Sequence, residues 1–255
     1  MDSLDPVRCK NKFASDIAGT LSWAGIEFDG LIHHQYHDDF RFLKKFNELK
    51  EAQLTYPCFC SRKEALRLTE DGHPYYNGTC RRLPSSVSQR RIHNGDPHCW
   101  RFRVQCEGVT LNDIAAGELD IPSIEWGGDF VLWRRDNCPA YPLASVVDDV
   151  YLNITEINRG RDLIAPSAAQ TLLFHAFNQP IPGFLHFPLL TDSEGKKLSK
   201  RKKETAPETQ FQNGKAFMEY WASAFQIPLS ELQSQRPGIE TICLAAQKEN
   251  ILFKT

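Results

Sequence analysis

The sequence "YPLASVVDDVYLNITEINRGRDLI", from Tyr141 to Ile164, carries the main evidence for a fold class. Within it and around it, apolar runs typical of strands alternate with runs typical of helices. The expected strands are Phe130–Trp133, Asn153–Ile157 and His186–Leu190, and the expected helices are Leu143–Val150 and Ser167–Phe177. Such alternation is typical of a parallel α/β sheet.

The composition is that of a globular protein with a sizeable core, because 41% of the 255 residues are hydrophobic and 24% are charged. No window approaches the ~18 consecutive apolar residues of a membrane helix, and the first thirty residues lack the apolar run of a signal peptide. We therefore expect a cytoplasmic protein. The pI near 6.4 excludes a global nucleic-acid footprint, so any RNA contact must come from local basic patches.

The regions before and after the α/β alternation have different residue patterns. Helices are expected over Val7–Ala24 and 37–53, and in the second of these Phe42, Phe46 and Leu49 share a face. Between Tyr56 and about Asp113, cysteines, prolines and basic pairs accompany short strand-like runs such as "HCWRFRV", which indicates an inserted subdomain. Closing helices are expected at 214–227 and 239–251.

The inserted region contains a candidate metal site. Eight cysteines are too few for a disulfide scaffold in a chain of this length, which favours reduced thiols. Cys58, Cys60 and Cys80 supply three thiols within 23 residues and suit three corners of a tetrahedral zinc site. The fourth ligand is either the phenolate of Tyr76 or the imidazole of His73. The alternative is that these cysteines are small buried residues that pack as minor hydrophobes.

A basic run, "KKLSKRKK" at Lys196–Lys203, is the second candidate site. A lysine-rich loop is usually a solvated surface. This one directly follows the run "FLHFPLLTDSEG", so it would leave the carboxyl end of a strand, where open α/β sheets bind their ligands. A serine between lysines at that place suits the charge that develops on a leaving pyrophosphate.

Tyr141 and Arg159 form the third candidate site. The planar fork of an arginine suits a substrate carboxylate, and a tyrosine hydroxyl can orient an ammonium group. The alternative is a structural ion pair between Arg159 or Arg161 and one of two acidic residues, Asp148 or Asp149.

Together these pieces resemble one family. "KLSKR" at Lys197–Arg201 resembles the second ATP signature of class I aminoacyl-tRNA synthetases, and Tyr141–Ile164 resembles their glutamyl and glutaminyl branch. The spacing of "CFC" and "YNGTC" is similar to that in the zinc insertion of the glutamyl-queuosine tRNA(Asp) synthetases. The opening "MDSLDPVR" resembles the end of the family's first glutamate-binding strand, and the resemblance extends to about residue 210.

The resemblance implies an α/β fold: a class I synthetase Rossmann-like catalytic domain that is incomplete at its N-terminus. It carries a small zinc-bearing insertion and a C-terminal helical segment. The implied division is 1–54 for part of the first half of the catalytic domain, 55–115 for the insertion, 116–204 for the second half with the KLSKR loop, and 205–255 for the helical segment.

The implied activity is the activation of glutamate with ATP and Mg²⁺, followed by transfer of the glutamyl group to queuosine in the anticodon loop of tRNA(Asp), by a monomer. By position, Lys200 contacts ATP, and Ser199 and Lys197 shape its loop. Tyr141, Arg159 and Asp2 hold glutamate. One structural zinc ion is bound by four residues: Cys58, Cys60, Tyr76 and Cys80.

Two departures from the family pattern keep alternatives open. The first ATP signature, a His-x-Gly-His stretch, is expected ahead of "MDSLDPVR" and does not occur in the chain. Asp2 stands where the family has a glutamate. The alternatives are an inactive or mis-started remnant that binds only tRNA or zinc, and a truncated discriminating glutamyl-tRNA synthetase.

Overall fold

The computed structural model describes residues 4, 9, 11–26, 28, 30–35, 40–191, 197, 210–225 and 251–252. The α-helices are α1 (Asn11–Trp23), α2 (Phe40–Glu51), α3 (Arg62–Ala65), α4 (Ser85–His93), α5 (Tyr141–Tyr151), α6 (Ile164–Ala176) and α8 (Gly214–Phe225). Short 3-10 helices are η1 (Thr79–Arg82), η2 (Ser123–Trp126) and η3 (Arg161–Leu163). The strands are β1 (Thr55–Cys58), β2 (Leu66–Leu68), β3 (Pro74–Tyr76), β4 (Cys99–Phe102), β5 (Gly108–Asp113), β6 (Gly117–Pro122), β7 (Val131–Trp133), β8 (Glu156–Gly160), β9 (Gly183–Phe187), β10 (Leu190–Thr191) and β11 (Ile251–Leu252).

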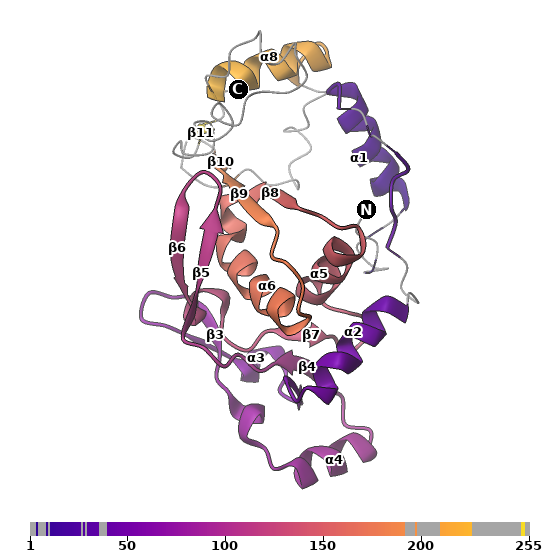
Figure 1. Cartoon of the computed structure of the whole chain (residues 1–255), viewed down its shortest axis with the longest axis vertical. Helices are drawn as coiled ribbons and strands as arrows, with labels where there is room; N and C mark the ends of the chain where they lie inside the picture. Colours follow the sequence, from indigo (N-terminus) through magenta and orange to yellow (C-terminus); the bar gives the residue numbers. More distant parts are fainter. Residues whose placement is uncertain are drawn as a thin grey trace.

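The largest sheet has the strand order β6-β5-β9-β8. Strand β9 runs parallel to both β8 and β5, while β5 and β6 form an antiparallel hairpin. Helix α6 packs on this sheet through a core that includes Leu111, Ala168 and Phe184. The expected α/β fold is therefore confirmed, and the parallel part of this sheet consists of β5, β9 and β8. Figure 1 shows this sheet beside α5 and α6, with α4 at one end of the molecule and α8 at the other.

Two of the expected strands are each displaced by three residues: β8 is 156–160 where 153–157 was expected, and β9 is 183–187 where 186–190 was expected. The strand expected over Asn153–Ile157 begins at Glu156 instead, because Asn153 has a left-handed φ of 53° as the chain leaves α5. The strand expected over His186–Leu190 begins at Gly183 and ends at Phe187. The next residue is Pro188, which has no N–H group to continue a ladder.

A second sheet, β1-β4-β7, is antiparallel throughout. The expected strand Phe130–Trp133 lies here as β7, so its expected place in a parallel sheet was wrong. The buried face of α2 packs with α5, α6 and β7, and the predicted face of α2 is confirmed. The central residues of this core are Phe42, Phe46, Leu49, Leu132, Leu143, Val146, Leu173 and Phe174.

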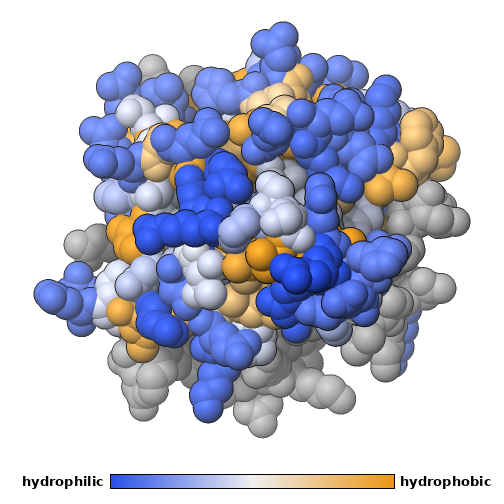
Figure 2. Space-filling model, turned by 90° about the horizontal axis from the view of Figure 1, so that it is seen from below, coloured by the Kyte–Doolittle hydropathy of each residue, from blue (hydrophilic) through white to orange (hydrophobic). Residues whose placement is uncertain are grey.

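Strands of the range 55–115 pair with strands of the range that follows it. Strand β5 pairs with β9, and β7 pairs with β4. The division of the chain into separate units stays a prediction. The end of the molecule that carries α4 is seen in Figure 2, where hydrophilic side chains dominate and apolar ones form small separate patches.

The remaining helix expectations divide into two groups. Helices α1 and α8 occur within the expected ranges, and their Trp23 and Phe217 rings lie 5.6 Å apart. The helix expected at 239–251 lies outside the described residues apart from Ile251, which belongs to β11. Among the residues that the structure describes, no helix has the length and apolar character needed to cross a membrane.

Candidate metal centre and amino-acid site

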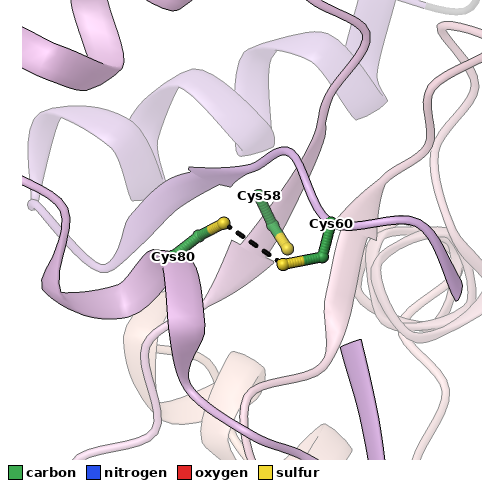
Figure 3. A group of neighbouring side chains, drawn as sticks. All are labelled: Cys58, Cys60 and Cys80. Carbon is green, nitrogen blue, oxygen red and sulfur yellow. Dashed lines mark hydrogen bonds between the residues drawn. The ribbon is translucent and has the colours of Figure 1, made fainter. Parts of the chain in front are cut away.

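The three predicted cysteine ligands converge at one end of β1. Cys58 ends this strand, Cys60 follows two residues later, and Cys80 lies in η1. Their sulfur atoms all lie within 4.8 Å of one another, and the Cys60 and Cys80 sulfurs are 3.5 Å apart. Figure 3 shows the three side chains pointing toward a common centre. Cys58 and Cys80 are buried, and Cys60 is half-buried.

The local sequence explains why Cys80 turns back toward β1. Gly78 has a φ of 76°, which favours glycine, and it directly precedes η1 as its N-cap. The side-chain oxygen of Asn77 accepts the Thr79 N–H at 3.0 Å, and its amide donates to the Glu64 carbonyl at 2.7 Å. The Asn-Gly turn thus fixes η1 against α3, and Cys80 faces the strand end.

Tyr76 is the fourth predicted ligand, and it lies in the same cluster. Its hydroxyl oxygen is 3.5 Å from the Cys58 sulfur and accepts the Cys80 backbone N–H at 2.8 Å. His73 is exposed in the turn between β2 and β3 and is not part of the three-cysteine group. The geometry therefore favours Tyr76 over His73, and its role as a ligand stays a prediction.

The thiols of the cluster differ in their electrostatics. Hydrogen bonds from Cys99, Tyr76 and Arg101 lower the pKa of Cys58 to about 4, against the effect of burial. Burial and the hydrogen bond with Cys80 raise the pKa of Cys60 to about 12. Zinc prefers thiolates and deprotonates coordinating thiols. The three-cysteine cluster therefore fits a zinc ion, which would supply a cross-link between β1 and η1.

Cys99 is a neighbour of this cluster that the sequence interpretation missed. It lies opposite Cys58 in the β1–β4 ladder, and its sulfur is 3.6 Å from the Cys58 carbonyl oxygen. The available signal was its place in the strand-like run "HCWRFRV". Its partner could not be read from spacing, because 41 residues separate it from Cys58.

Arg159 lies on β8 and bonds to neutral groups. Its Nη1 atom donates to Gln170 Oε1 at 2.7 Å and to Ser167 Oγ at 3.3 Å. Asp148 instead accepts a hydrogen bond from Gln35 at 2.7 Å and lies 3.6 Å from the Arg41 guanidinium. The alternative of an Arg159–Asp148 ion pair was therefore wrong.

Tyr141 begins α5 and is 47% exposed. Ser145 follows one helical turn later on the same face, and its hydroxyl oxygen accepts a hydrogen bond from Gln170 Nε2 at 2.7 Å. Gln170 thus bonds both to Arg159 and to the face of α5 that Tyr141 begins. The Gln170 side chain therefore links the two elements that carry Arg159 and Tyr141, the residues predicted to bind glutamate.

A buried polar network beside Arg159 was also missed. His186 Nδ1 is 2.7 Å from Asp113 Oδ2, and its Nε2 is 2.9 Å from Ser167 Oγ. These residues come from β5, β9 and α6. Their separation in sequence hides the contact, and only the histidine between apolar strand residues gave a signal.

The basic loop is described at one position. Lys197 is exposed, forms an ion pair with Asp162 and makes a β-bridge with Thr191. Ser199 and Lys200, which are predicted to form the ATP site, lie outside the described residues. So does Asp2, which is predicted to bind the substrate glutamate.

Comparison with known families gives one match of the whole α/β region. The family described as "tRNA synthetases class I (E and Q), catalytic domain" matches residues 1–221. The expectation from the sequence motifs is thus confirmed at the level of the family.

The chain covers different shares of the lengths of its individual relatives. A glutamyl-Q tRNA(Asp) synthetase of Neisseria meningitidis is 38% identical over 204 residues, covering 79% of this chain and 68% of that protein. A glutamate–tRNA ligase of Aquifex aeolicus is 33% identical over 207 residues, and the chain spans only 43% of it. The solved structure of a glutamate-tRNA synthetase from Elizabethkingia anophelis is similar with a TM-score of 0.75 and 20% identity, over 99% of this chain and 60% of that one. This last likeness shows the fold.

Proposed function

We propose a function from one premise: this chain belongs to the class I tRNA synthetases for glutamate and glutamine, within their catalytic domain. On that premise, the chain activates glutamate with ATP and transfers the glutamyl group to queuosine in tRNA(Asp). The observation that carries this choice is that relatives named glutamyl-Q tRNA(Asp) synthetase are 33–38% identical over 79% of the chain.

The proposed chemistry has two steps. A glutamate carboxylate oxygen attacks the α-phosphorus of ATP, and pyrophosphate leaves with its bonding electrons. A hydroxyl group of queuosine then attacks the glutamyl carbonyl carbon, and AMP leaves. Arg159 and Tyr141 orient glutamate for the first step, together with Asp2. Positioning of this kind lowers the barrier because it replaces a chance encounter by a fixed geometry.

The basic loop is proposed to stabilise the leaving pyrophosphate. Lys200 contacts ATP, which binds with Mg²⁺, while Ser199 and Lys197 shape the loop. The ion pair of Lys197 with Asp162 supports this role, because Asp162 lies in η3, which directly follows β8, the strand of Arg159. One structural zinc on Cys58, Cys60, Cys80 and Tyr76 stabilises the inserted region. We expect the protein to act in the cytoplasm as a monomer.

A second candidate is the charging of tRNA(Glu). The Aquifex aeolicus glutamate–tRNA ligase is 33% identical to this chain, which equals the identity of the Symbiobacterium thermophilum glutamyl-Q tRNA(Asp) synthetase. Both candidates share the activation of glutamate and differ in the RNA that receives it.

The decisive experiment measures activation first and transfer second. Glutamate-dependent ATP–pyrophosphate exchange is measured for the 255-residue chain and for a form extended upstream to any in-frame His-x-Gly-His stretch. Transfer of labelled glutamate is then measured with queuosine-containing tRNA(Asp), with the same tRNA lacking queuosine, and with tRNA(Glu). We expect exchange, and transfer only to the queuosine-containing tRNA(Asp).

Each contrary outcome selects an alternative. Transfer to tRNA(Glu) alone supports the second candidate. Absence of exchange in both forms of the protein, with zinc or tRNA binding retained, supports an inactive remnant.

A further inference from the structure

We propose that Asp113, His186 and Ser167 are positioning residues that fix the guanidinium group of Arg159. This inference rests on the proposed role of Arg159 in binding glutamate. It concerns side chains that do not themselves reach the substrate.

Asp113 anchors the network at the end of β5. Its Oδ1 atom accepts the backbone N–H groups of Ala115 at 3.0 Å and Ala116 at 2.8 Å. Its Oδ2 atom accepts the backbone N–H of His186 at 3.0 Å and faces the ring Nδ1 at 2.7 Å. A carboxylate is an acceptor only. The Nδ1 atom of His186 must therefore carry a hydrogen.

His186 connects Asp113 to Ser167 through its two ring nitrogens. Burial lowers the pKa of His186, so the ring is neutral at neutral pH and its one hydrogen lies on Nδ1. The Nε2 atom is then an acceptor, 2.9 Å from Ser167 Oγ. The Leu163 carbonyl is a second acceptor, 2.7 Å from the same oxygen. The single hydroxyl hydrogen of Ser167 goes to one of these two acceptors.

The lone pairs of Ser167 are thus left for Arg159. The Nη1 atom of Arg159 has two hydrogens, and it donates to Ser167 Oγ at 3.3 Å and to Gln170 Oε1 at 2.7 Å. Because the guanidinium group is planar, fixing Nη1 from two sides fixes the orientation of the whole fork. The ring of Phe184 lies 5.5 Å from the guanidinium carbon and limits tilting. A group held in this way binds a carboxylate without first losing conformational freedom.

The order Asp113–His186–Ser167 is also that of a hydrolase triad, but burial excludes that role. Ser167 is 0% exposed, His186 is 3% exposed and Asp113 is 4% exposed. A substrate cannot reach the serine oxygen, which already contacts the Leu163 carbonyl and Arg159. The network therefore orients Arg159 and does not itself contact a substrate.

The experiment combines a spectroscopic readout of Arg159 with glutamate kinetics. Guanidinium ¹⁵N–¹H spectra report whether the two Nη groups of Arg159 give separate signals, which requires slow rotation about the Nε–Cζ bond. The Arg159→Lys variant identifies these signals by their loss. We expect separate Nη signals in the unmodified protein and merged signals in Ser167→Ala. We also expect the KM for glutamate to rise about tenfold in Ser167→Ala, with the KM for ATP unchanged.

Two substitutions at His186 separate the halves of the network. His186→Asn retains a group that can face Asp113 and loses the group that faces Ser167, so it should behave like Ser167→Ala. His186→Gln can retain the group that faces Ser167, so it should restore part of the glutamate affinity. The matched control is Thr171→Val, which removes another buried hydroxyl from α6. That hydroxyl bonds only to the Ala168 carbonyl among the contacts described, so neither readout should change.

The outcomes for the network and for the proposed function can be told apart. Separate Nη signals that persist in Ser167→Ala overturn the positioning role, whatever the activity. Merged signals in Ser167→Ala together with no glutamate-dependent exchange in the unmodified protein support the positioning role and overturn the proposed function. An equal rise in the KM for ATP, or an equal effect of Thr171→Val, indicates general destabilisation and overturns the inference.

Discussion

The cysteine cluster and the polar network around Arg159 are both buried, but their contacts differ in kind. The network is built from side chains that are strong donors or acceptors, as between Arg159 and Gln170 at 2.7 Å. In the cluster, sulfur faces sulfur, as between Cys60 and Cys80 at 3.5 Å. Thiols are weak donors and weak acceptors. The side chains of the network therefore hold one another, whereas we expect the cluster to depend on a bound cation.

This difference predicts two kinds of failure. Loss of one member of the network should change the orientation of Arg159 while the fold persists. Loss of one member of the cluster should release the metal and with it the cross-link between β1 and η1.

The largest effect is expected for Arg159→Ala. It removes the charged fork proposed to bind the glutamate carboxylate, and a charge-assisted bidentate contact is worth about 3 kcal/mol. We expect kcat/KM for glutamate in ATP–pyrophosphate exchange to fall at least about 100-fold. Arg82→Ala is the control, because Arg82 is an exposed arginine of η1. A similar loss in both variants would contradict a specific role for Arg159.

Cys58→Ser is expected to abolish zinc binding and to lower the free energy of unfolding by about 3 kcal/mol. Metal analysis of the purified protein and chemical denaturation measure the two effects. Cys106→Ser provides the control, since Cys106 is exposed and lies outside the cluster. Unchanged zinc content in Cys58→Ser would show that the thiols are only packed hydrophobes.

Tyr76→Phe tests the fourth ligand. The Cys80 backbone N–H loses its acceptor, which should cost about 1–3 kcal/mol of stability. If the phenol oxygen binds the metal, zinc affinity in competition with a chelator should also fall at least about tenfold. Unchanged zinc affinity with reduced stability would leave Tyr76 as a hydrogen-bonding neighbour of a three-thiolate site.

The smallest effects concern the exposed arginines near the cluster. Arg82 and Arg90 are exposed, whereas Arg81 pairs with Asp129 and Arg91 pairs with Asp96. We expect Arg82→Ala and Arg90→Ala each to weaken tRNA binding by a few-fold and to reduce its salt slope by about 1. Equal slopes for the variants and the unmodified protein would place the RNA elsewhere.

The sequence predicted the parts of the molecule that depend on local spacing. The apolar spacing around Phe42, Phe46 and Leu49 predicted α2, and the spacing of Cys58, Cys60 and Cys80 predicted the cluster. Arg159 and Tyr141 were paired as a candidate site from their chemistry and assigned to glutamate through the family resemblance, and their roles stay predictions.

The polar network could not be predicted from the sequence, because it depends on long-range contacts and not on local spacing. Asp113 and His186 are 73 residues apart and meet only because β5 lies beside β9. The same long-range pairing decides where β7 lies, since an apolar run of three residues has no sequence signal for its partner strand.

Strand β5 has a consequence for how this architecture can be altered. It lies within the range predicted as the insertion, yet its last residue, Asp113, holds His186 in the sheet of Arg159. The range 55–115 is therefore not a detachable module, because its excision would remove the carboxyl group that contacts His186 beside the proposed amino-acid site. A chimera that exchanges this region between relatives must end its graft before Asp113 or bring an equivalent carboxylate with it.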